Sequence, residues 1–211
     1  MNKGVVSVLV AYLIWGLYPF YFHAMQHVAP TEIVIHRVLW TFALLAVYLF
    51  CSRRWRWIQK AITDRRTVAV FLMSSVLITA NWSTYTYAIV TNQTLEASLG
   101  YFMNPLVSVL LGTVFLKEKL NKAQMLAIVF ACAGVMWVTF KQGEFPALGL
   151  TLALSFGFYG LVRKMAPLGS LEGLTLETAF AFPVALLATF YFAGNGDLTF
   201  VHGTSWDKFW L

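Results

Sequence analysis

The sequence predicts an all-α polytopic membrane protein with about seven transmembrane helices. Three observations indicate this class: the composition, a succession of long apolar runs, and an alternation of basic loops between those runs. Of the 211 residues, 59% are hydrophobic and 11% are charged, and the mean hydropathy is +0.70. A soluble domain is typically about 45–50% apolar and about 25% charged, so this chain has too little polar surface for water.

The apolar runs follow one another along the whole chain. They are Gly4–Ala24, Glu32–Cys51, Val68–Val90, Leu95–Leu116, Ala123–Phe140, Ala147–Val162 and Leu171–Ala193. Most reach the roughly 17–25 residues that a spanning helix needs, and the sixth is borderline short. The first run is not a cleavable signal, because it is too long and ends in His and Gln instead of small residues.

Basic residues gather in alternate loops. The segment before the first run and the loops after the second, fourth and sixth runs hold twelve of the 15 Lys and Arg residues. Because Lys and Arg accumulate in cytoplasmic loops, the amino terminus is predicted to be cytoplasmic. The same bias accounts for the net charge of +6, so we expect the lipid bilayer, and no nucleic acid, as the partner of these loops.

A short internal repeat links the two ends of the chain. "IWGLYPF" in the first run matches "SFGFYGL" in the sixth with an offset of 141 residues between Gly16 and Gly157, and Glu32 and Glu172 are 140 residues apart. We expect residues 1–141 to form a first five-helix repeat and residues 142–211 to begin a second, inverted one. Inverted repeats are typical of secondary transporters, which bind substrate near the bilayer midplane.

The chain resembles a known family along essentially its whole length. The resemblance is carried by "AYLIWGLYPFYF", "EIVIHRVLW", "NQTLEASLGYFMNPLVSVLLG", "LKEKL", "ALSFGFYGLVRK" and "LETAFAFP". These segments are similar to the RarD-like proteins of the EamA family, in the drug/metabolite transporter superfamily; RarD-like proteins are commonly described as chloramphenicol-sensitivity proteins. The resemblance implies ten helices in two inverted five-helix repeats, placed in the cytoplasmic membrane of a bacterium. It also implies efflux of a small metabolite or drug. The chain ends where an eighth helix is expected, so we expect it to be a fragment.

Several polar residues inside the runs are candidates for a substrate cavity: Arg37, Asn81, Tyr101 and Asn104, with Glu177 approaching from the cytoplasmic half and Trp15 as a stacking aromatic. Ionisable residues at such depth usually face a cavity or a partner. A direct Arg37–Glu177 pair is geometrically doubtful, because the two enter from opposite sides. Trp15 could instead be a packing aromatic. Asn104-Pro105 is either a structural kink or a broken helix that lines the cavity.

Three other carboxylates have a simpler interpretation. Glu32, Glu96 and Glu172 each follow a hydroxyl residue (Thr31, Thr94 and Ser170) at the start of an expected helix. We expect the hydroxyl to cap the helix and the carboxylate to lie in its first turn, where the helix dipole stabilises negative charge.

The sequence offers little that is typical of an enzyme. His23, His27, Glu32 and His36 form a weak metal-binding pattern, but they match no recognised site, and no nucleophile elbow, zinc helix or phosphate loop is present. We therefore expect no enzyme, no cofactor and no metal.

Ala127, Ala131 and Gly134 in the fifth run suit close helix packing or a homodimer. The preferred hypothesis is a secondary transporter for a small organic molecule. The alternatives are a membrane protein with an interaction role and, less favoured, a membrane enzyme with a metal site.

Overall fold

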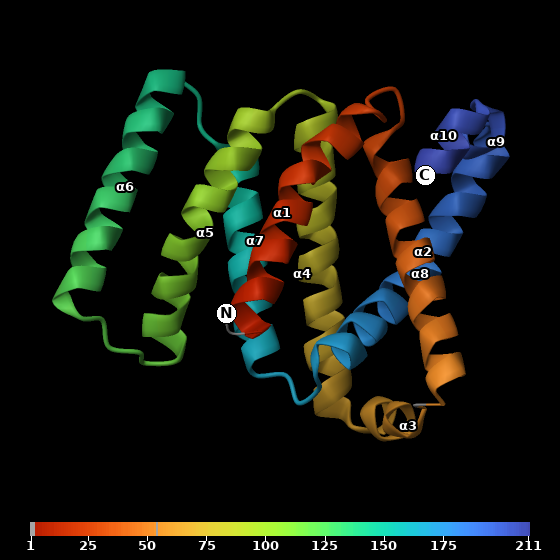
Figure 1. The fold of residues 1–211 in the computed structure, drawn as a ribbon, viewed down its shortest axis with the longest axis horizontal. Helices are drawn as coiled ribbons and strands as arrows, with labels where there is room; N and C mark the ends of the chain where they lie inside the picture. The colour runs from red at the N-terminus through yellow and green to blue at the C-terminus, as the bar shows by residue number, and fades with distance from the viewer. Residues whose placement is uncertain (1–2, 54) are drawn as a thin grey trace.

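The computed structural model describes residues 3–53 and 55–211, and every regular element in that part is a helix (Figure 1). The elements are α1 (Lys3–His23), α2 (Pro30–Ser52), α3 (Arg56–Thr63), α4 (Arg65–Val90), α5 (Thr94–Phe115), α6 (Lys122–Gln142), α7 (Ala147–Lys164), α8 (Ser170–Asn195), α9 (Thr199–His202) and α10 (Ser205–Trp210).

Six of these helices are long and apolar enough to cross a membrane: α1, α2, α4, α5, α6 and α8. The all-α polytopic fold class is therefore confirmed. The sixth expected span is α7, an 18-residue helix that does not meet the same threshold of apolar length. Arg163 and Lys164 occupy its last turn and lower its apolarity. Its packing against α4 and α5 nevertheless places it within the bundle.

Local sequence sets several helix ends. The Thr67 hydroxyl and backbone N–H groups donate to the Asp64 carboxylate at the start of α4, and these hydrogen bonds lower the pKa of Asp64. Asn121 forms a capping box with Gln124 at the start of α6. Gly143 ends α6 with φ of 72°, a left-handed conformation that glycine adopts without strain.

The expected hydroxyl caps are wrong. The residues before α2, α5 and α8 are Ala29, Gln93 and Gly169, and none of them makes a side-chain capping bond. Thr31, Thr94 and Ser170 lie inside their helices. In α2 the reason is visible in the sequence, because Pro30 suits the first helical position and starts the helix two residues early. The three carboxylates do lie in the first turns, as expected.

The bundle is tightest where α5 crosses α7. A Cβ added to Gly100 would lie 2.8 Å from the Leu152 Cβ and 3.0 Å from the Gly149 carbonyl oxygen. Both glycines therefore allow the two backbones to approach closely, as small residues do in membrane helix pairs. This contact holds α5 in place, and α5 forms one wall of the cleft described below.

The helices at the periphery expose apolar surface. α6 stands at one edge of the bundle in Figure 1, and the apolar stretches of α1 and α6 are almost entirely unburied. Exposed side chains such as Leu13, Phe20, Phe130 and Trp137 would be unfavourable in water but suit a lipid environment. The loops that follow α2, α5 and α7 all lie at the same end of the bundle (Figure 1).

Candidate substrate cleft

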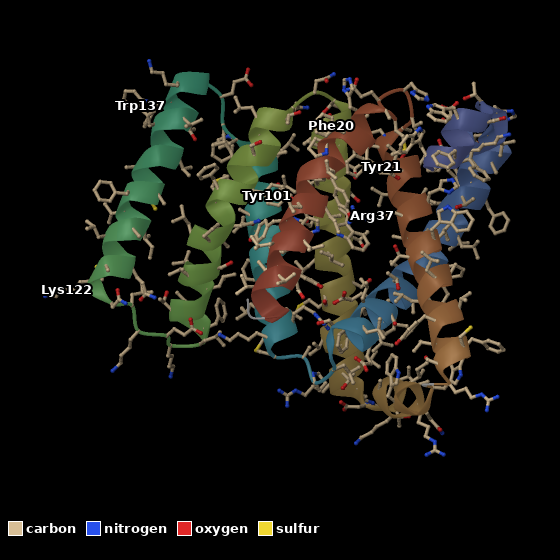
Figure 2. All side chains as sticks on the ribbon, viewed as in Figure 1. Phe20, Tyr21, Arg37, Tyr101, Lys122 and Trp137 are labelled. Atoms are coloured by element: carbon tan, nitrogen blue, oxygen red, sulfur yellow. The ribbon has the colours of Figure 1, made fainter. Side chains whose placement is uncertain are left out.

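A cleft with a volume of about 620 Å³ opens between α1, α2, α4 and α5, and Phe156 of α7 also contributes to its lining. Five of the six expected residues line it: Trp15, Arg37, Asn81, Tyr101 and Asn104. Arg37 and Tyr101 lie at similar heights along the bundle (Figure 2). The volume is within the range typical of small-molecule sites, about 300–1,000 Å³.

Arg37 lies between two aromatic side chains. Its guanidinium carbon is 4.2 Å from the centre of the Trp82 ring and 5.8 Å from that of Tyr18. These distances allow cation–π attraction, which stabilises a cation that has left water. No carboxylate of the described chain lies within ion-pair distance of Arg37. A second hollow of about 570 Å³ is lined by the same three residues, so Arg37 stands between two cavities.

The two asparagines of the cleft differ in their hydrogen bonding. The Asn81 amide donates to the Leu152 carbonyl and to the Ser155 hydroxyl, both at 3.1 Å, and so ties α4 to α7. The Oδ1 atom of Asn104 is buried and accepts no hydrogen bond from the described residues. Asn81 therefore has a structural role as well, whereas the Asn104 amide is free to bind a ligand.

Pro105 does not break its helix. α5 runs without interruption from Thr94 to Phe115, so the broken-helix interpretation of Asn104-Pro105 is wrong. Both residues still line the cleft. The Tyr101 ring packs edge-on against Tyr85 at a centroid distance of 5.7 Å, which extends the aromatic wall across α4 and α5.

Glu177 lies outside the cleft. Its side chain is 1% exposed, and its carboxylate accepts hydrogen bonds from the hydroxyls of Ser74 and, at 3.4 Å, Tyr159. Arg163 Nε lies 3.6 Å from Oε1 and neutralises the charge. The expectation that Glu177 approaches the Arg37 pocket is therefore wrong. The sequence indicates for Arg163 only a basic residue of a cytoplasmic loop, whereas it lies in the last turn of α7 and its side chain reaches Glu177 of α8.

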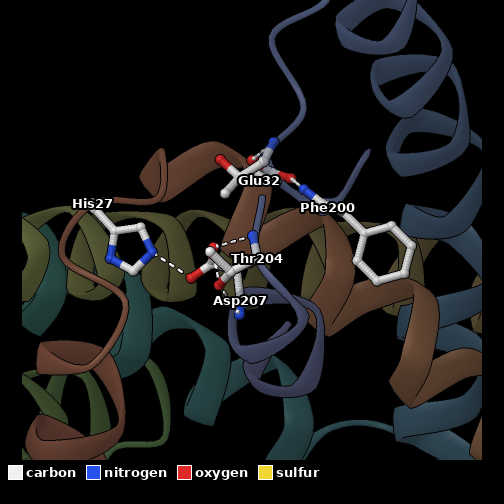
Figure 3. A network of polar contacts seen from close by, with 6 residues as sticks. His27, Glu32, Phe200, Thr204 and Asp207 are labelled. Atoms are coloured by element: carbon white, nitrogen blue, oxygen red, sulfur yellow. Dashed lines mark hydrogen bonds and ion pairs between the residues drawn. The ribbon is translucent and has the colours of Figure 1, made fainter. Parts of the chain in front are cut away.

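The histidine pattern does not gather into one site among the described residues. Figure 3 shows two of its members, His27 and Glu32, which contact different residues of the C-terminal segment. Glu32 accepts backbone N–H groups of Thr199 and Phe200 at 3.0 and 2.8 Å, and so caps α9. His27 Nε2 lies 2.6 Å from an Asp207 carboxylate oxygen. Across the described ranges, no three His, Cys, Asp or Glu residues come close enough to hold a metal ion together.

Two carboxylates join distant helices in ways that sequence reasoning missed. Glu96 accepts the Leu148 backbone N–H at 3.0 Å, so it caps α7 although it lies in α5. The Thr204 hydroxyl and His27 both hydrogen bond to Asp207 and lower its pKa. Such contacts depend on which loops meet in space, and no short-range pattern in the sequence predicts them.

Among the described residues, membrane-length helices surround an aromatic cleft whose arginine has no carboxylate partner, and this arrangement defines a polytopic membrane protein with a candidate small-molecule site. The comparisons with known proteins agree. The chain belongs to the EamA-like transporter family, which matches residues 2–140.

Similar proteins occur in several bacteria. The chain is 42% identical to the uncharacterized transporter YojE of Bacillus subtilis, over 88% of this chain and 63% of that protein. It is 39% identical to the protein RarD of Escherichia coli, over 92% of this chain and 66% of the relative. It is 29% identical to the chloramphenicol-sensitive protein RarD of Pseudomonas aeruginosa, over 94% of this chain and 68% of the relative. The chain thus spans just under two thirds of the length of YojE and of the E. coli RarD. No solved structure is significantly similar to it.

Proposed function

We propose that the protein is a secondary transporter that exports a small organic metabolite or drug across the bacterial cytoplasmic membrane. The observation that carries the proposal is the cleft around Arg37, where a cation inside a spanning helix has an aromatic lining and no carboxylate partner among the described residues. A charge at this depth is costly, and the residues that carry one typically mark a substrate or ion pathway. The proposal requires no catalytic step.

In the proposed orientation, the amino terminus of the protein lies in the cytoplasm. Most of the basic residues lie in three segments: from the end of α2 to the start of α4, from the end of α5 to the start of α6, and in the last turn of α7. All three segments lie at one end of the bundle, which supports a cytoplasmic position for that end (Figure 1). The helix pairs α1–α2 and α7–α8 run in opposite directions in the same view. This arrangement supports two inverted repeats, with residues 1–141 as the first and residues 142–211 as the start of the second.

The direct test of transport is solute flux through the reconstituted protein. Amino acids and amphenicol-like drugs are offered to proteoliposomes with and without a pH gradient, because one relative is named for chloramphenicol sensitivity. We expect gradient-dependent or exchange flux of at least one solute. Replacing Arg37 by Leu should reduce that flux to the level of empty liposomes while membrane insertion is retained, because the substitution makes α2 more apolar.

Two outcomes count against transport. One is the absence of flux for every solute, which would favour the alternative of a membrane protein with an interaction role. The other is undiminished flux through Arg37→Leu, which would remove the cleft from the pathway.

A further inference from the structure

The charge of Arg37 is the feature of the cleft that still needs a partner. Arg37 lies about 10 Å along α2 from Pro30, counted at 1.5 Å per residue. Arg163, the other arginine whose side chain reaches into the bundle, is paired with Glu177. In the described chain the guanidinium of Arg37 makes cation–π contacts to Trp82 and Tyr18 and no ion pair.

Those aromatic contacts leave the hydrogen-bonding capacity of Arg37 unused. A guanidinium carries five N–H donors in one plane, and no described residue accepts a hydrogen bond from this one. Its fork of donors matches the two oxygens of a carboxylate, and such charge-assisted pairs are the strongest hydrogen bonds that a side chain can make. Arg37 is therefore held in place by its aromatic neighbours and free to bind an anion.

The rest of the cleft indicates the body of that anion. Tyr18, Trp82, Tyr85 and Tyr101 supply flat apolar surfaces around the cation. Asn104 Oδ1 is buried without a donor, so a hydroxyl or N–H group of the ligand can satisfy it. The cleft of about 620 Å³ has room for a ring-sized molecule.

We propose that this cleft selects small organic monoanions, namely carboxylates with an aromatic or similarly flat apolar body, and that Arg37 binds the carboxylate. The proposal rests on the proposed transport function and names its substrate class. One positive charge balances one negative charge. A doubly charged phosphate ester would bring a second negative charge that has no partner in the lining, which is costly within a membrane.

The test compares probes that share a phenylethyl body and differ in charge. Dissociation constants of 3-phenylpropionate, 3-phenylpropionamide and 2-phenylethyl phosphate are measured by calorimetry on the purified protein in detergent. We expect the carboxylate to bind about tenfold more tightly than its amide, because a hydrogen-bonded charge contributes more than a neutral group. The phosphate should bind more weakly than the carboxylate.

Three variants connect this preference to Arg37. Arg37→Gln should bring the affinities for carboxylate and amide within about twofold of each other, whereas Arg37→Lys should keep part of the preference because it keeps the charge. Lys141→Gln is the matched control: it also removes one cation, but this lysine lies at the end of α6, over Trp137 and away from the cleft. Its preference should equal that of the wild type.

The binding and flux measurements together distinguish the anion proposal from the transport proposal. Equal affinity for carboxylate and amide, no binding of the carboxylate, tighter binding of the phosphate, or a preference that persists in Arg37→Gln would overturn the anion proposal even if other solutes are transported. Arg37-dependent carboxylate preference without flux of any solute would instead support the anion site and reject transport.

Discussion

At the scale of single residues, two charges inside the bundle behave in opposite ways. Glu177 is enclosed by Ser74, Tyr159 and Arg163, so its charge is neutralised within the protein. Arg37 has aromatic contacts and faces two hollows. The first arrangement is expected of a group that stabilises the fold, and the second of a group that binds a ligand.

The Glu177–Arg163 contact yields the first prediction at this scale. Glu177→Leu should lower the free energy of unfolding by about 3 kcal/mol, because it leaves the Arg163 charge inside the bundle without a partner. Adding Arg163→Met should recover most of that loss, since an apolar pair of similar volume replaces the ion pair. Unfolding by denaturant in detergent measures both effects. A single variant as stable as the wild type would show that the pair contributes little.

The sequence predicts which polar residues line the cleft better than it predicts their partners. Arg37, Asn81 and Asn104 are recognisable because polar groups deep in apolar runs are rare. The partners of Glu96 and Asp207 are not, because each carboxylate joins segments that are far apart in the chain. Spacing along one helix carries no information about such contacts.

At the scale of elements, the apolar runs became helices with ends displaced by a few residues at most. Their existence could be predicted because a membrane requires long apolar helices. Which helices pack against one another could not be predicted, since the surfaces that face lipid and those that face protein are both apolar. α3, α9 and α10 were also not expected, because helices of four to eight residues give too short a pattern.

The α5–α7 crossing gives a prediction for this scale. Gly100→Ala should destabilise the bundle, because the new methyl group meets Leu152 Cβ and the Gly149 carbonyl, and a backbone must shift to accommodate it. Gly160→Ala, on α7, meets nothing within 4 Å and should be neutral or stabilising by about 1 kcal/mol through helix propensity. Melting temperatures in detergent compare the two variants. Equal melting temperatures would mean that the crossing tolerates extra volume.

At the scale of the whole molecule, α6 is the least integrated spanning helix. It packs on α5, and its apolar stretch is unburied. Ala127, Ala131 and Gly134 share one face that is exposed beside the α5 contact. We propose that this small-residue face mediates a homodimer, as such faces do in other membrane helices.

Cysteine cross-linking tests the dimer. In a background with Cys51→Ser and Cys132→Ser, Ala131→Cys should form a disulfide-linked dimer in membranes under mild oxidation. Val129→Cys lies at nearly the same depth on the opposite side of α6 and should remain monomeric. Equal cross-linking at both positions would indicate random collision instead of a defined interface.

The proposed function depends most on the cleft around Arg37 being open to water and solute, and the accessibility of cysteines placed on α5 measures this. Ser108 lines the cleft about 21 Å further along the helix than Thr94, whereas Leu110 is exposed and lies outside the lining on the other side of α5. In the same background without native cysteines, single variants Ser108→Cys and Leu110→Cys are treated with a charged methanethiosulfonate reagent in membrane vesicles. We expect rapid modification at position 108 and almost none at position 110, because a thiol that faces lipid does not ionise. Labelling of 110 as fast as 108, or an unreactive 108, would contradict it.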